Sequence, residues 1–310
     1  MNYIGNIIKE YRNYLGINRK ELSKNICSEK YVYLIEKGER TPSAEMVKNF
    51  SDRLGVDLFD YYQYLDCTNP IQVRDYIILF KMYYRKNNFE ELKKASDNAI
   101  ELPDFHKKPW SFEIELNNLA YNVFVENKYN EAIIKTKKLL QDIEPKYLNS
   151  IEVANFYILL STCYQLTGDL TNANFILSFA YEMSRNKKKI EKYEQIITSI
   201  RISMISFNYL YGKYDDVIRE AGELLNYQSE FNSYERVHYT YFYLAFAYYK
   251  IGLLDKSIEW FKKGIYSLMH EYKPMDVYYI TMQDVFDVLA YDIMDDKNLI
   301  TEFKNKYKLS

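Results

Sequence analysis

Cysteine, proline and glycine are all scarce in this sequence, with 3, 6 and 9 residues among 310. The cysteines Cys27, Cys67 and Cys163 are scattered and odd in number, so they form neither a disulfide framework nor a metal site. We expect them to be buried, reduced thiols. Few glycines and prolines over such a length predict short turns and a mostly helical chain. The sequence therefore predicts an all-α fold.

An excess of positive charge and a long apolar run are also missing. The net charge is −2, so any binding of nucleic acid would need a local basic face. The N-terminus carries charges every few residues, unlike a signal peptide. The most apolar run, residues 239–254, is interrupted by Lys250 and is too short to span a bilayer. We expect a cytoplasmic protein with no membrane partner.

Signatures of catalysis are missing as well. The histidines His106, His238 and His270 lie far apart in the sequence, and no nucleophile–base spacing, phosphate-binding loop or metal-ligand cluster accompanies them. We therefore expect no enzyme, no catalytic residue, and neither a cofactor nor a metal.

The segment from Asn18 to Pro42 contains two short helical patterns, residues 19–25 and 28–37, separated by a break. Ser28 can cap the second helix, and Gly38 can end it in the left-handed conformation. The second helix is too short to be stable alone. Its outward positions carry long polar and aromatic side chains, which suits an element that reads the major groove of DNA.

This segment resembles the helix-turn-helix of the Xre/Cro class. The matching positions are Glu21-Leu22-Ser23, Ser28, Val32, Ile35-Glu36, Gly38, Pro42-Ser43 and Leu54-Gly55-Val56. Apolar periodicity predicts five helices, over residues 4–15, 19–25, 28–37, from Ser43 to Gly55, and 58–65. The resemblance implies a DNA-binding domain over residues 1–66 and an ion pair between Arg12 and Glu36.

The candidate DNA-binding residues lie on and beside the second helix of the motif. We expect Lys30 to reach guanine acceptors and Tyr33 to contact a thymine methyl group or a phosphate. The flanking cations would neutralise phosphates, although each lysine can equally be an ordinary solvated charge. The full candidate set is Arg19, Lys20, Ser28, Glu29, Lys30, Tyr31, Tyr33, Lys37 and Arg40.

A repeat of about 40 residues follows a predicted linker at residues 67–72, where Asn69-Pro70 indicates a helix boundary. Five turns share one pattern, with Gly or Asn first and a large apolar residue two positions later. They begin at Asn87, Asn127, Gly168, Gly212 and Gly252. Five positions after each turn residue lies a residue of the predicted interior: Leu92, Ala132, Ala173, Val217 and Ser257. The pattern predicts paired helices that stack as repeats.

These units resemble tetratricopeptide repeats and would occupy residues 73–310, with residues 275–308 as a capping pair. Such a superhelix has a concave surface, here basic, then amide-rich, then aromatic. Amides can bond the main chain of an extended peptide, and aromatic rings can take its apolar side chains. The alternative is that the rings pack between repeats. The predicted peptide-binding residues are Arg74, Lys81, Tyr84, Asn117, Tyr121, Phe124, Asn155, Thr162, Gln165, Tyr209, Tyr239, Phe242, Phe246 and Tyr249.

An Xre-type domain joined to tetratricopeptide-like repeats resembles the Rgg/PlcR/PrgX/NprR group of peptide-responsive regulators, and most closely its PlcR-type branch. The resemblance implies a cytoplasmic homodimer that binds double-stranded operator DNA and responds to a short signalling peptide in quorum sensing. It implies main-chain contacts from Asn117 and Asn155, or from Asn118 and Asn122 if the register is shifted by one. The alternative is a DNA-binding adaptor whose repeats dock a protein partner.

Overall fold

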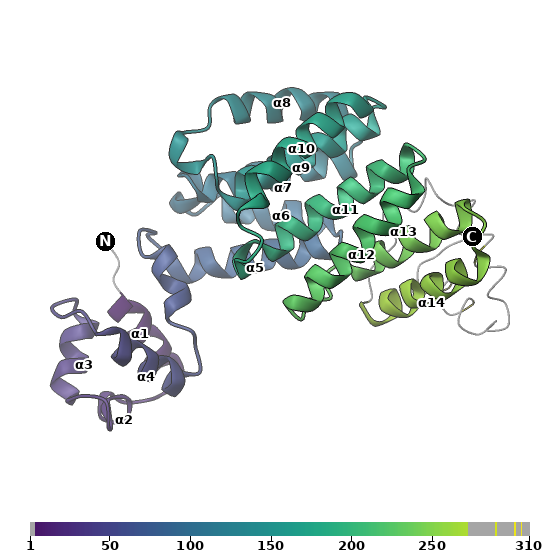
Figure 1. Ribbon diagram of the computed structural model, residues 1–310. Helices are drawn as coiled ribbons and strands as arrows, with labels where there is room; N and C mark the ends of the chain where they lie inside the picture. Colours follow the sequence, from purple (N-terminus) through teal and green to yellow (C-terminus); the bar gives the residue numbers. More distant parts are fainter. Residues whose placement is uncertain (1–3, 272–288, 290–300, 302–304, 306–310) are drawn as a thin grey trace. The chain divides into compact units, whose positions relative to one another are not determined.

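The computed structural model describes residues 4–271 together with residues 289, 301 and 305 (Figure 1). Within these residues the chain consists of helices and turns, which confirms the expected all-α class. The chain divides into two compact units, Met1–Tyr84 with Glu90–Asn118, and Arg85–Phe89 with Leu119–Ser310. No helix among the described residues combines the length and the apolar character that crossing a membrane requires.

The first unit begins with the helix-turn-helix domain. Its helices surround one small core, in which Ile8, Leu22, Val32, Ile35 and Phe50 are completely buried. The elements are α1 (Ile4–Tyr14), α2 (Arg19–Ser23), α3 (Glu29–Glu36), α4 (Ala44–Leu54) and the 3₁₀ helix η1 (Phe59–Tyr64).

The first four helices confirm the sequence pattern, whereas the predicted fifth α-helix is a 3₁₀ helix. Tyr61 and Tyr64 are both buried and lie three residues apart. In a 3₁₀ helix, side chains three residues apart lie on the same face. The tighter helix therefore turns both rings inward, which explains the difference from the prediction.

Local side-chain caps define the ends of the short helices. Asn18 Oδ1 accepts from the backbone N–H of Glu21, and the Glu21 carboxylate accepts from the backbone N–H of Asn18, both at 2.8 Å. This reciprocal pair is a capping box. Ser28 Oγ accepts from Tyr31 N at 3.2 Å and caps α3 as predicted. The turn between α2 and α3 uses Asn25 at a φ of 60°, since asparagine tolerates the left-handed region that glycine usually supplies.

The first unit continues into the first pair of repeat helices without a loose connection. Arg74 Nε pairs with Asp60 Oδ2 at 2.6 Å, and its guanidinium lies 4.9 Å from the ring centroid of Tyr61. The rings of Tyr64 and Trp110 stack with centroids 4.9 Å apart. The elements that follow η1 are α5 (Pro70–Arg85), α6 (Phe89–Ala99), η2 (Pro103–His106) and α7 (Trp110–Phe124).

A buried carboxylate holds the segment that the sequence predicts as a linker. Asp104 of η2 is only 3% exposed, and its oxygens accept from Thr68 N at 2.6 Å and Asn69 N at 3.0 Å. These N–H groups precede the first turn of α5, where no intrahelical acceptor exists. The predicted linker at 67–72 is thus ordered and lies inside a compact unit. The bounds of the DNA-binding domain, residues 1–66, stay a prediction.

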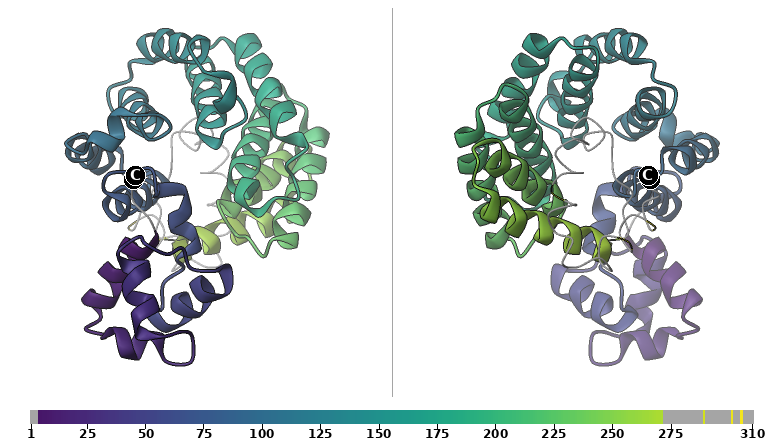
Figure 2. Two further views of the ribbon diagram at one scale, coloured as in Figure 1. Left: turned by 90° about the vertical axis from the view of Figure 1, so that its left-hand side faces the viewer. Right: turned by 90° about the vertical axis from the view of Figure 1, so that its right-hand side faces the viewer.

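The second unit is a succession of paired helices (Figures 1 and 2). The predicted turn residues Asn87, Asn127, Gly168, Gly212 and Gly252 all have positive φ, between 52° and 82°. The five predicted interior residues, Leu92 of the first unit and Ala132, Ala173, Val217 and Ser257 of the second, are all completely buried. The capping pair expected at residues 275–308 lies outside the described residues apart from positions 289, 301 and 305. The elements are α8 (Tyr129–Gln141), η3 (Pro145–Tyr147), α9 (Ile151–Leu166), α10 (Leu170–Arg185), η4 (Glu191–Tyr193), α11 (Glu194–Leu210), α12 (Tyr214–Glu230), α13 (Val237–Lys250) and α14 (Leu254–Glu271).

Two helical glycines of this unit are expected to respond oppositely to substitution by alanine. A Cβ on Gly264 of α14 would lie 2.8 Å from Cε1 of the completely buried Phe242, so Gly264→Ala should destabilise by about 1–3 kcal/mol. A Cβ on Gly222 of α12 meets nothing within 4 Å, so Gly222→Ala should stabilise by about 0.5–1 kcal/mol. Urea unfolding of the two variants measures both changes in the free energy of unfolding. A change in the same direction for both variants would contradict the packing described.

Candidate nucleic-acid interface

Helix α3 turns one face into the domain core and the other to solvent. Val32 and Ile35 are completely buried, whereas Ser28, Glu29 and Lys30 at its start are exposed. The start of the helix is therefore free to approach a ligand, as the sequence predicts. Tyr31, which was predicted to point outward, is half-buried and packs against the domain core. It follows the buried face because it lies one residue before Val32 and four before Ile35.

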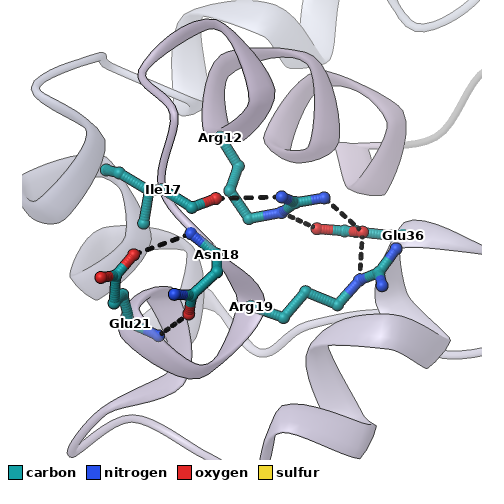
Figure 3. Close-up of polar contacts among 6 residues, drawn as sticks. All are labelled: Arg12, Ile17, Asn18, Arg19, Glu21 and Glu36. Atoms are coloured by element: carbon teal, nitrogen blue, oxygen red, sulfur yellow. Dashed lines mark hydrogen bonds and ion pairs between the residues drawn. The ribbon is translucent and has the colours of Figure 1, made fainter.

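Glu36, at the end of α3, holds two arginines from two other parts of the domain (Figure 3). Arg12 of α1 donates from Nε to Oε1 at 2.6 Å, and Arg19 of α2 donates from Nε to Oε2 at 2.7 Å. Arg12 also donates to the carbonyl oxygen of Ile17 at 3.0 Å. The Glu36 side chain is only 2% exposed. The Arg12–Glu36 ion pair is confirmed, and the triad joins three helices around one buried carboxylate with a net charge of +1.

The second arginine of the triad also contacts Tyr33. The Arg19 guanidinium carbon lies 5.2 Å from the Tyr33 ring centroid, and Lys37 Nζ lies 4.8 Å from it. The pKa of Lys37 is raised above its ordinary value, first by its hydrogen bond and charge interaction with Tyr33 and then by the charge of Glu39. Lys37 therefore stays a cation at neutral pH. The remaining predicted cations, Lys20 and Arg40, are exposed.

The residues predicted to bind a peptide fall into three groups. One group is buried: Asn117, Thr162, Tyr209, Tyr239, Phe242 and Phe246. A second group is half-buried: Arg74, Tyr84, Tyr121, Phe124, Asn155, Gln165 and Tyr249. Only Lys81 is exposed among the predicted set. The three groups therefore differ in how much side-chain surface a ligand could reach.

Asn117 has an internal partner in this structure. Its Nδ2 donates to Ser96 Oγ at 2.9 Å, and the residue is 2% exposed. The next residue, Asn118, is half-buried, and its amide oxygen has no hydrogen-bond partner among the described residues. Asn117 thus points into the interior, and Asn118, the alternative for a register shifted by one, lies about 100° around the helix from it. Which of the two contacts a peptide stays a prediction.

The aromatic residues expected at the far end belong to the interior. On α13, Phe242 and Phe246 are completely buried, and both rings lie within 6.5 Å of Phe261 on α14. Helix α13 is buried on nearly all of its faces, from Val237 to Ala247. The alternative interpretation, that these rings pack between helices, therefore describes Phe242 and Phe246. Arg74 is likewise engaged, by Asp60 and Tyr61.

Comparisons with known proteins identify the same architecture. Residues 8–61 match the family model described as Helix-turn-helix. PlcR from Bacillus thuringiensis, solved in complex with the peptide PapR7 and DNA, aligns with a TM-score of 0.68 at 16% identity over 92% of this chain and 99% of that chain. This chain has the PlcR fold.

Two further solved structures agree with the PlcR fold. PlcR in its apo form aligns with a TM-score of 0.56 at 16% identity, over 94% of this chain and 98% of that chain. ComR from S. thermophilus, in complex with DNA and its signalling peptide ComS, aligns with a TM-score of 0.53 at 13% identity, over 95% of this chain and all of that chain. No curated protein matches the sequence. The fold comparisons confirm a helix-turn-helix domain followed by helical repeats.

Arg53 contributes to the helix-turn-helix domain of this PlcR-fold chain in a way that the sequence did not predict. Arg53 of α4 donates from one terminal nitrogen to the carbonyl oxygens of Glu21, Leu22 and Lys24, at 3.1, 2.8 and 2.6 Å. These carbonyls lie at the end of α2, where the last carbonyl groups of a helix have no N–H donor within the helix. A basic residue in the last turn of α4 was visible in the sequence, but its partners lie about 30 residues away.

Proposed function

We propose that the protein is a DNA-binding transcriptional regulator whose repeat helices respond to a short signalling peptide. The observation that supports this proposal is the exposed start of α3. Ser28, Glu29 and Lys30 face solvent there, while the opposite face of the helix packs into the domain core. Such a helix can enter the major groove with its first turn against base edges. PlcR and ComR, whose fold the chain shares, were solved with both DNA and a peptide.

Each exposed residue of the interface has a role in this proposal. Lys30 donates to guanine O6 and N7, and Ser28 contacts a base or a phosphate. Glu29 accepts from a cytosine amino group. Lys20, Lys37 and Arg40 neutralise phosphates around the helix. One domain of this size buries little DNA surface, so a homodimer on a two-fold site completes the interface.

The peptide part of the proposal rests on side chains of the second unit that retain exposed surface. Asn155 and Gln165 of α9 and Tyr249 of α13 are half-buried, so part of each side chain faces outward. Amide groups donate and accept at once, which suits the main chain of an extended ligand. A regulator of this kind works in the cytoplasm, where both the operator and a re-imported peptide meet it.

Replacing Lys30 by alanine is expected to lower affinity for a selected operator by about tenfold, the cost of one base contact. The operator is first selected from a pool of randomised duplexes with the full chain. Affinity for an unselected duplex should fall only by the smaller amount that one cation contributes through its attraction to the phosphates. Lys94→Ala on α6, another exposed lysine, should change neither value. An equal loss on both duplexes would make Lys30 a phosphate contact.

The same operator titration, repeated with synthetic peptides of about five to ten residues, tests the second half of the proposal. The peptides are taken from short open reading frames that flank the gene. A peptide that changes operator affinity is expected to lose that effect in Asn155→Ala. If no peptide binds in calorimetry while DNA binding persists, the repeats dock a protein partner instead, as in the adaptor alternative.

A further inference from the structure

Tyr33 lies next to two cations at the edge of the candidate interface. Its ring centroid is 5.2 Å from the Arg19 guanidinium carbon and 4.8 Å from Lys37 Nζ. Both distances fall within the range of about 6 Å over which an aromatic face attracts a cation. The residue is 38% exposed, so the three side chains form one assembly at the surface.

Arg19 is fixed a second time by the buried carboxylate of Glu36. Its Nε donates to Glu36 Oε2 at 2.7 Å, which leaves the two terminal nitrogens outside that bond. A guanidinium is planar and rigid, so a bond at Nε and a ring contact together set the direction of its remaining N–H groups. The Arg19 side chain is 35% exposed, and those groups can meet a ligand.

Lys37 is held more loosely but stays charged. Its side chain is 51% exposed and makes one contact of 3.7 Å with the equally exposed Glu39. Ion pairs of this exposed kind contribute little and exchange easily for another anion. The Tyr33 ring is therefore the contact that Lys37 shares with Arg19, and it places both cations on one side of α3.

We propose that Tyr33 is a positioning residue, whose ring orders Arg19 and Lys37 into a pair of cations that binds the phosphates of the DNA backbone. The inference rests on the proposed DNA-binding function and replaces the sequence-based role of Tyr33, a contact to a thymine methyl group or a phosphate. A cation that is ordered beforehand loses less side-chain freedom when it binds. The pair thus adds affinity for any duplex, without sequence preference.

The test is fluorescence anisotropy of the full chain with a duplex of mixed sequence and about 25 base pairs, titrated between about 50 and 200 mM KCl. Tyr33→Leu and Tyr33→Gln, both at an exposed position, are expected to weaken binding about threefold to tenfold and to reduce the salt slope by about one. Tyr33→Phe keeps the ring and loses only the hydroxyl, which hydrogen-bonds Lys37, so its affinity and slope should stay closer to those of the wild type than to those of Tyr33→Leu. The thermal unfolding midpoint of each variant shows whether that variant is still folded.

A double-mutant cycle decides whether Tyr33 acts through the two cations. In the Arg19→Met, Lys37→Met background, Tyr33→Leu should have no further effect. An additive loss, or a loss in Tyr33→Phe equal to that in Tyr33→Leu, overturns the inference and makes Tyr33 a direct contact. If the wild type binds no duplex at all, the proposed function fails first and the inference with it. The two failures are therefore distinguishable.

Discussion

Replacing Glu36 by alanine is expected to destabilise the helix-turn-helix domain by about 3–5 kcal/mol. Two arginines depend on this carboxylate, and the Arg12 side chain is only 10% exposed. Without Glu36 the Arg12 charge stays buried with a single backbone acceptor, the carbonyl oxygen of Ile17. The cost is therefore that of an uncompensated buried charge, not that of one lost ion pair.

Trp110 makes this loss measurable. The chain has two tryptophans, and Trp110 stacks on Tyr64 of the helix-turn-helix domain. In a Trp260→Phe background, urea unfolding followed by Trp110 fluorescence reports on the first unit. The control is Glu39→Ala, whose side chain is 56% exposed and should change stability by less than about 0.5 kcal/mol. Similar midpoints for the two variants would contradict the role of the triad.

Features that depend on a few neighbouring residues were predictable from the sequence. The turn residues Asn127 and Gly212 have the positive φ that their residue types favour. Ser28 caps α3 because its hydroxyl reaches an N–H three residues on. In each case the partner lies within one turn of the chain, so the pattern alone contains the geometry.

Features that depend on tertiary placement were not predictable in the same way. The sequence predicts Arg19 as a phosphate contact but does not show that its Nε is bound by Glu36, 17 residues away. Asn117 was expected to contact a ligand, but it bonds Ser96, 21 residues away. Sequence spacing predicts which residues share a helix face only to within about one residue. An error of one residue rotates a side chain by about 100°, which can move it from the surface into the core.

One signal in the sequence could have corrected the expected aromatic contacts. Residues 237–249 are apolar or aromatic at nearly every position, and a helix that is apolar all round is buried all round. The structure bears this out for α13, where Phe242 and Phe246 are completely buried. Helix α9 differs from α13, because its Asn155 and Gln165 are only half-buried.

Replacing Asp104 by alanine is expected to destabilise the first unit by about 2–4 kcal/mol. Its carboxylate accepts two backbone N–H groups, from Thr68 and Asn69, at a site where Asp104 is 3% exposed. Alanine leaves both donors without an acceptor, so the whole desolvation cost of two amides is incurred. Asp104→Asn should lie between alanine and the wild type, because its one amide oxygen can accept from only one of them with good geometry.

The contrast with Asp97 makes the argument specific. Asp97 of α6 is 59% exposed and pairs only with Lys93 one turn earlier, so Asp97→Ala should cost less than about 0.5 kcal/mol. Trp110 fluorescence during urea unfolding measures the difference, and hydrogen exchange localises it to the amides of Thr68 and Asn69. A flexible linker would leave these amides unprotected in the wild type. Because Asp104 binds them from η2, we expect slow exchange in the wild type and faster exchange in Asp104→Ala.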